Sequence, residues 1–156
     1  MLTLLPVLVA VGAGLVAGVF LAFSSFVMKA LAALPAEQGV AAMQQINVVV
    51  LNPLFLGVFV GTALLAGIGM VGAVLSWGTP RAMLLFVCGV SYVVGCFGVT
   101  VAFNVPRNER LARLPADSAE AMAYWPVYVR EWLAWNHVRT VASAIAAASA
   151  AVALSR

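Results

Sequence analysis

Charged side chains are scarce in this sequence of 156 residues. Only 8% of its residues are Asp, Glu, Lys or Arg, whereas 65% are hydrophobic. A soluble domain carries about 25% charged residues, which it needs to cover its surface. The shortage of charge therefore excludes an ordinary soluble domain and predicts that lipid surrounds most of the protein.

Histidine and cysteine are scarce as well. His137 is the only histidine, so one chain cannot build a site from two or three histidines, and we predict no metal site. We expect no cofactor, with haem bound through His137 as the alternative. Cys88 and Cys96 are eight residues apart, roughly 12 Å along a helix, which is too far for a disulfide between them.

The motifs of nucleotide and nucleic-acid binding are missing too. No Gly-rich loop follows a strand pattern, and no serine lies in a nucleophile-elbow motif. The net charge of +3 is too small to indicate nucleic acid as a partner. The partners that we predict are the lipid bilayer and a hydrophobic small molecule.

Four long apolar stretches dominate the chain instead. Each can cross a hydrocarbon core of roughly 30 Å, which takes about 20 residues. Residues 1–28 contain no Lys or Arg, so we expect the first stretch to be a true span and not a cleavable signal peptide. The fold predicted is all-α, an antiparallel bundle of four transmembrane helices that makes residues 1–156 a single membrane domain. The spans are predicted at about residues 4–28, 53–77, 82–103 and 133–154.

The connections hold most of the polar residues. Residues 36–50 are typical of a short amphipathic helix in loop one, and Asn52-Pro53 indicates the start of the next helix. The connection 77–81 predicts a tight turn between antiparallel spans. In the long connection 104–132, Asp117 or Ser118 is a candidate N-cap for an interfacial helix that leads into the fourth span.

Small residues recur every four positions inside the spans. Such rows let helix backbones approach closely in a membrane. We expect them to pack within the bundle, with a dimer seam as the alternative. The rows consist of Ala10, Gly14, Gly18 and Ala22; of Gly57 and Gly61; and of Ala142, Ala146 and Ala150.

The distribution of basic residues predicts the orientation. Loops one and three, which share a side, contain Lys29 and four arginines, whereas the other side has only Arg81 and Arg156. Cytoplasmic loops are enriched in Lys and Arg, so both termini are predicted on the non-cytoplasmic side. We expect the inner or cell membrane of a bacterium, and a homo-oligomer stays an open alternative.

Polar residues gather where spans three and four meet the long connection. A stripe on the predicted fourth helix holds Trp132, Asn136, Arg139, Thr140 and Ser143, and His137 lies about 100° away from it. An arginine at the centre of an apolar helix costs about 2.5–3.5 kcal/mol, so it usually faces the bundle interior or a wet cavity. We predict a pocket here, with an Arg139 that snorkels and pairs with a carboxylate or with helix carbonyls as the alternative. The predicted site residues are His137, Arg139, Arg107, Asn104, Asn108, Trp132, Trp135, Asn136, Thr140, Asn47 and Asn52.

Two motifs carry most of these residues. They are Phe103-Asn104-Val105-Pro106-Arg107-Asn108-Glu109-Arg110-Leu111 and Trp132-Leu133-Ala134-Trp135-Asn136-His137-Val138-Arg139-Thr140. Together with Gln45-Ile46-Asn47 and Asn52-Pro53, they resemble the anthrone oxygenase-like family of small four-helix membrane proteins. The resemblance covers nearly the whole chain.

The resemblance implies a membrane-embedded oxidoreductase, a monooxygenase that oxidises a hydrophobic, anthrone-like aromatic substrate with O₂ and without a cofactor. His137 would take a proton, and Arg139 or Arg107 would stabilise the enolate oxygen. Asn104 and Asn136 would orient ring oxygens, while Trp132 and Trp135 would stack on the aromatic body. Two alternatives stay open: a binding or transport module for a small amphipathic molecule or a quinone, and a structural subunit of a larger membrane complex. Oxygen uptake, ligand binding without oxygen uptake, and a co-purifying partner discriminate the three.

Overall fold

The computed structural model describes residues 4–156 and contains helices but no strand in that range. Four helical rods are long and apolar enough to cross a membrane: Leu4–Ala32, Pro53–Leu75, Pro80–Ala112 and Ala119–Ser155. The predicted all-α bundle of four apolar helices is therefore confirmed. In chain order the elements are α1 (Leu4–Ala22), the π-helical η1 (Phe23–Val27), α2 (Met28–Ala32), α3 (Ala36–Val49), α4 (Pro53–Leu75), α5 (Pro80–Val90), the π-helical η2 (Ser91–Gly98) and η3 (Thr100–Asn104), α6 (Val105–Ala112), α7 (Ala119–Val152) and the 3₁₀ turn η4 (Ala153–Ser155).

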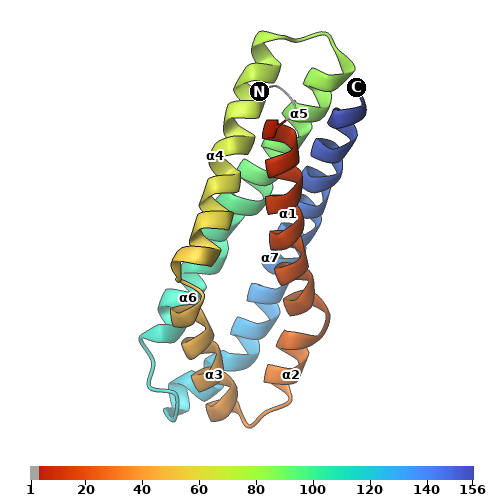
Figure 1. Ribbon diagram of the computed structural model, residues 1–156. Coiled ribbons are helices and arrows are strands. Elements are labelled where there is room, and N and C mark those ends of the chain that lie inside the picture. Colours follow the sequence, from red (N-terminus) through yellow and green to blue (C-terminus); the bar gives the residue numbers. More distant parts are fainter. Residues whose placement is uncertain (1–3) are drawn as a thin grey trace.

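Side-chain caps fix where the helices begin. Asn52 accepts a hydrogen bond from the Phe55 N–H at the start of α4, where Asn52-Pro53 indicated a helix start. Ser118, one of the two predicted N-cap candidates, accepts from the Ala121 N–H at the start of α7. Thr79 caps α5, and Gly78 adopts φ +107° in the turn before it. This turn makes α4 and α5 antiparallel neighbours (Figure 1).

The long connection is more helical than its sequence indicated. Residues 105–112 continue the third rod as α6, and α7 starts at Ala119, so only residues 113–118 link the two. Pro106 lies at the start of α6, directly after the π-helical η3, where the hydrogen-bond pattern of the rod shifts by one residue. The amphipathic stretch before the fourth span is thus part of the same helix as the span.

The bundle has two ends of different character. The beginning of α1, the C-terminus and the α4–α5 turn lie at one end, and α2, α3, α6 and the first half of α7 lie at the other (Figure 1). We call the second region, residues 28–47 and 106–135, the cap, and the remainder the membrane half. All but three of the charged residues are in the cap; Arg81 and Arg156 are at the far end, and Arg139 is inside the bundle.

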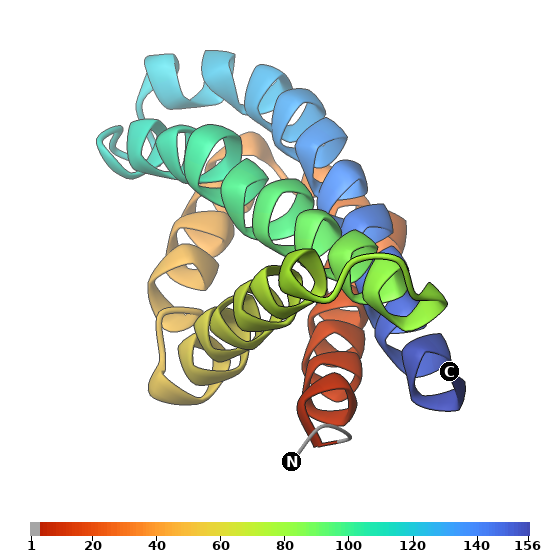
Figure 2. The same ribbon diagram turned by 90° about the horizontal axis from the view of Figure 1, so that it is seen from above.

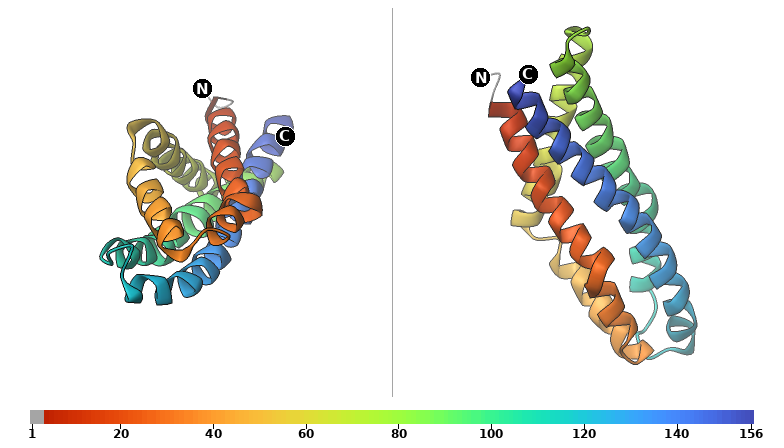
Figure 3. Two further views of the ribbon diagram at one scale, coloured as in Figure 1. Left: turned by 90° about the horizontal axis from the view of Figure 1, so that it is seen from below. Right: turned by 90° about the vertical axis from the view of Figure 1, so that its right-hand side faces the viewer.

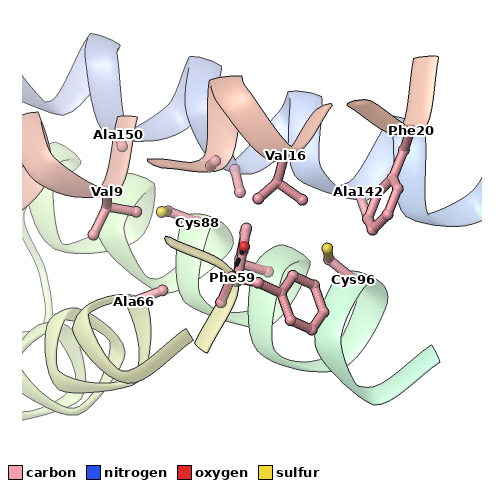
Figure 4. Close-up of a cluster of buried hydrophobic side chains, with 12 residues drawn as sticks. Val9, Val16, Phe20, Phe59, Ala66, Cys88, Cys96, Ala142 and Ala150 are labelled. Atoms are coloured by element: carbon pink, nitrogen blue, oxygen red, sulfur yellow. Dashed lines mark hydrogen bonds between the residues drawn. The ribbon is translucent and has the colours of Figure 1, made fainter. Parts of the chain in front are cut away.

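Each region has its own core. The core of the membrane half lies between α1, α4, α5, η2 and the second half of α7, and consists of small and aliphatic residues with a few aromatic rings (Figure 4). α1 and α7 run side by side along it (Figure 3). The core of the cap is built from larger side chains: Met28, Leu31, Val40, Met43, Leu111, Ala121, Tyr124, Trp125, Tyr128 and Trp132.

The rows of small residues behave differently from one another. Ala142, Ala146 and Ala150 are buried in the core, as predicted. Gly14, Gly18, Gly57 and Gly61 face open space, because a Cβ at any of them would meet no atom within 4 Å. The prediction that these glycines pack within the bundle is therefore wrong; in α1 the close approach is made by Gly12, against the side chain of Thr62.

The outer surface of the membrane half is apolar. Exposed aliphatic side chains cover α1, α4, the third rod and the end of α7, for example Leu15, Leu64, Val94 and Val141 at 58–65% exposure. A surface of this kind is stable only against lipid hydrocarbon. The chain is accordingly an integral membrane protein, whose orientation stays a prediction.

Candidate functional site

A cavity of about 500 Å³ lies at the junction of the membrane half and the cap. Its volume is within the range of small-molecule sites, roughly 300–1,000 Å³. Most of its wall is apolar, and α1, α3, α4, the third rod and α7 all contribute. The lining residues are Val19, Phe20, Phe23, Met43, Gln44, Ile46, Asn47, Val48, Val50, Leu51, Phe55, Leu56, Phe59, Val60, Phe97, Thr100, Val101, Val105, Asn108, Glu109, Ala112, Trp132 and Arg139.

Arg139 is the one basic side chain in this lining, and it is only 4% exposed. Its guanidinium carbon lies 4.1 Å from the centroid of the Phe20 ring and 5.1 Å from that of Trp132. The guanidinium donates to Thr100 Oγ1 (3.2 Å) and to Asn136 Oδ1 (2.7 Å).

These partners leave the charge of Arg139 uncompensated. Among residues 4–156, Nε of Arg139 has no hydrogen-bond partner and no carboxylate lies within ion-pair distance of the side chain. The alternative of a carboxylate-paired Arg139 is therefore wrong. A buried cation with neutral partners is costly, and an anion bound in the cavity would offset that cost.

Asn136 holds Arg139 in place. It is fully buried, and its amide nitrogen donates to the Phe20 carbonyl and to Ser24 Oγ, both at 2.8 Å. Phe20 lies in the last turn of α1, directly before the π-helical turn, and its carbonyl oxygen has a second lone pair that can accept from a side chain. With both amide hydrogens bound to α1 and η1, Asn136 Oδ1 is directed at Arg139.

His137 lies outside the cavity lining. Its side chain is exposed, with Nδ1 3.0 Å from Ser24 Oγ. Thr140 is also outside, where its hydroxyl donates to the Asn136 carbonyl and lies 3.0 Å from Ser24 Oγ. Neither side chain is hydrogen-bonded to the Arg139 guanidinium, whose bonds go to Thr100 and Asn136.

Asn108 lines the cavity and fixes one of its walls. Its Oδ1 accepts hydrogen bonds from the Tyr128 hydroxyl and from Trp132 Nε1, each at 2.9 Å. Trp132 thereby presents its ring to the cavity, where it also packs against Phe23 at a centroid distance of 5.5 Å.

The remaining predicted residues are split between the cavity and the surrounding structure. Asn47 lines the cavity. Asn52 is exposed, serves as the N-cap residue of α4 and borders a smaller neighbouring pocket. Arg107 pairs with Glu131 at 3.0 Å, behind the wall.

Asn104 and Trp135 also lie outside the cavity lining. Asn104 is buried and donates to the Trp132 carbonyl at 3.2 Å. Trp135 stacks on Phe103 with 3.7 Å between the ring centroids. Asn104, Trp135 and Arg107 therefore support the site from outside it.

Several lining and supporting residues were not predicted. Thr100 and Ser24 are isolated polar residues in apolar spans, and this isolation could have identified them as partners of the buried arginine. Phe20, Phe59 and the aliphatic wall carry no such signal, because core packing uses the same residue types.

Comparisons with known proteins complete the description of the site. A family model described as "Anthrone oxygenase" matches residues 45–149, which run from the last turn of α3 almost to the end of α7. No curated protein and no solved structure matches the chain. Within residues 4–156, no three His, Cys, Asp or Glu side chains are grouped so that they could hold a metal ion.

Proposed function

Because the chain belongs to the anthrone oxygenase family, we propose that it oxidises an apolar aromatic ketone of the anthrone type with O₂ inside the junction cavity. The family was predicted from its paired motifs and is confirmed by the match. The substrate, the use of O₂ and the roles of single residues are the proposal.

The observation that carries the proposal is the uncompensated charge of Arg139 at the wall of an apolar cavity. An apolar wall favours a flat hydrocarbon body, while a buried cation favours a negative charge on it. The enolate of an anthrone combines both properties. Arg139 would bind the enolate oxygen, with Thr100 and Asn136 fixing the guanidinium.

The reaction balances without another reactant. Loss of a proton from the methylene carbon opposite the carbonyl gives the enolate, which transfers one electron to O₂ to form a radical pair. The two radicals combine in a carbon–oxygen bond, and protonation of the resulting peroxide gives a hydroperoxide at the former methylene carbon. Loss of water from it leaves a second carbonyl, so the substrate CH₂ and O₂ become C=O and H₂O.

We assign the first proton transfer to Glu109 and not to His137, to which the family resemblance had assigned it. Glu109 is the one carboxylate that lines the cavity, and its side chain is 62% exposed, so it can pass the proton to water. His137 faces outward and is separated from the cavity by Ser24 and Asn136, and an amide does not take up a proton at neutral pH.

The test is oxygen uptake by the purified protein in lipid nanodiscs supplied with an anthrone. Arg139→Gln should lower kcat/KM by a factor of about 10² to 10³, the usual effect of removing one oxyanion-stabilising donor. Glu109→Gln should lower kcat, whereas His137→Ala should leave it nearly unchanged. The matched control is Arg130→Gln, which removes an exposed arginine from the same helix.

Two results would contradict the proposal. Unchanged turnover in Arg139→Gln would remove this residue from the chemistry. Saturable binding of the anthrone without any oxygen uptake by the wild type would favour the second predicted function, a binding or transport module.

A further inference from the structure

We infer that the substrate enters the cavity sideways from the lipid hydrocarbon, through a gap between the first two turns of α4 and the η3–α6 junction. Leu56 and Val60 frame the gap on one side, and Val101 and Val105 frame it on the other. The inference rests on the proposed function, since it assumes an apolar aromatic substrate that dissolves in the bilayer.

The first observation is that the cavity has an apolar mouth and a polar floor. The polar groups Thr100, Asn108 and Arg139 are buried or half-buried. Two of the exposed lining residues, Glu109 and Ala112, lie at the end of the cavity nearest the cap. The other exposed lining residues are larger aliphatic side chains: Val19, Val48, Leu51, Leu56, Val60, Val101 and Val105.

The second observation is that the four framing side chains belong to the cavity and to the outer surface at once. Leu56, Val60 and Val105 are 36–38% exposed and Val101 is 53% exposed, although all four line the cavity. The wall of the cavity at this position is therefore only one layer of aliphatic side chains thick.

The third observation is the path of α4. It packs against α1, α5 and η2, but η3 and α6 are not among its principal neighbours, and α4 and α6 diverge towards the cap (Figure 2). Gly57 and Gly61 lie on the α4 surface next to Leu56 and Val60, and a Cβ there would meet no atom within 4 Å. No helix of the described chain covers this edge of the gap.

The surroundings of the gap identify lipid as the source. Leu64 on α4 and Val94 on the third rod flank it and are 65% and 61% exposed, so they belong to the lipid-facing surface. An apolar ring system that moves from hydrocarbon into an aliphatic mouth never has to enter water, which would be unfavourable. Its oxygen atoms would then meet the polar floor first at Thr100 and Arg139.

A smaller pocket of about 200 Å³ between α1 and α4 offers an alternative route into the main cavity. It shares Val19 and Phe55 with the main cavity and is also lined by Val58, which is only two residues from Val60 but faces α1. Substitution of Val58 or Val60 by the same larger residue therefore separates the two routes.

The experiment compares Val60→Phe/Val101→Phe with Val58→Phe, and uses Leu64→Phe as a control outside both pockets. The proteins are reconstituted in vesicles, and a neutral anthraquinone already dissolved in the lipid is used as the probe. Its association is followed by quenching of tryptophan fluorescence, and oxygen uptake is measured with the anthrone. The double variant should slow association and raise KM severalfold. Val60→Ala/Val101→Ala, which widens the gap, should speed association.

The outcomes distinguish the lateral entry route from the proposed oxidation of an anthrone. A slowed association only in Val58→Phe, or equal rates in all variants, would overturn the lateral route through α4 and η3. A wild type that binds the quinone with the expected variant pattern but consumes no oxygen would leave the route standing and overturn the proposed function. A wild type that binds no quinone would overturn both.

Discussion

The membrane half and the cap are both bundles of packed helices, but different interactions hold them together. In the membrane half, α1 and α7 approach closely because small residues lie between them and their neighbours. Away from the junction cavity, few side-chain hydrogen bonds cross this core; the Tyr92 hydroxyl donating to the Phe59 carbonyl is an example. Close backbone packing is what remains available where lipid removes the hydrophobic effect between helices.

The cap is held by large side chains and by hydrogen bonds to them. Trp125, Tyr128 and Trp132 stack in sequence, with 5.6 Å and 6.5 Å between successive ring centroids. Gln44 donates to the carbonyls of Leu111 and Leu114, both at 2.8 Å, which ties α3 to the end of α6. The cap is thus built like a water-exposed domain, and the cavity forms where this architecture meets the closely packed one.

The largest effect on stability should come from the cap. Tyr128 is fully buried and stacks on two tryptophans, so Tyr128→Ala should cost about 3–5 kcal/mol of unfolding free energy, as truncation of a buried aromatic residue generally does. Tyr128→Phe removes only the hydrogen bond to Asn108 and should cost about 0.5–1.5 kcal/mol. Chemical unfolding in detergent measures both; equal losses would mean that the hydrogen bond, and not the packing, holds the cap together.

At the junction, Asn136→Asp tests whether the charge of Arg139 is kept free for a ligand. The new carboxylate would take the position of the oxygen that now lies 2.7 Å from the guanidinium and would neutralise it. Binding of an ionised hydroxyanthraquinone should weaken by about tenfold or more, since close opposite charges carry at least about 1.4 kcal/mol in a buried site. Neutral anthraquinone, titrated by fluorescence, is the matched ligand. An equal loss for both ligands would point to a misfolded cavity.

In the membrane half, Gly89→Ala tests the dependence on close backbone approach. A Cβ there would overlap the Met70 side chain and lie 2.9 Å from the Ala66 carbonyl oxygen, so α4 and α5 would have to separate. Overpacking of this kind costs about 1–3 kcal/mol. Gly61→Ala, on the open face of α4, is the control and should be neutral or slightly stabilising. Thermal denaturation in one detergent ranks the two, and equal midpoints would contradict the dependence of the membrane half on close backbone approach.

Sequence reasoning identified the helices more reliably than their contacts. The helix start at Asn52-Pro53 and the N-cap Ser118 follow from local chemistry, and the structure has both. The buried stripe of Trp132, Asn136, Arg139 and Ser143 follows from helical periodicity. Gly14 and Gly57 could not be placed in the same way, because a glycine suits a helix contact and an open helix face equally well. Which of the two applies depends on the path of the neighbouring helix.

In the candidate site, too, local sequence determined some features and contacts between distant helices determined others. Arg139, Asn108, Trp132 and Asn47 line the cavity, as their position near the end of the spans indicated. The angular step of about 100° already separates His137 from the stripe, and it is indeed His137 that faces outward. What the sequence could not supply was the partner on the first rod: Ser24 and the Phe20 carbonyl meet Asn136 through the packing of two helices that are far apart in the chain.

That turn also sets the phase of the first rod. In an uninterrupted α-helix, Phe20 and Met28 would point about 80° apart around the helix axis. If one of the two side chains faced its core directly, the other would point partly away from its own. The wider turn at Phe23–Val27 rotates the following segment, so that Phe20 is buried in one core and Met28 in the other. One continuous rod can therefore contribute side chains to two separate cores, one in the membrane half and one in the cap.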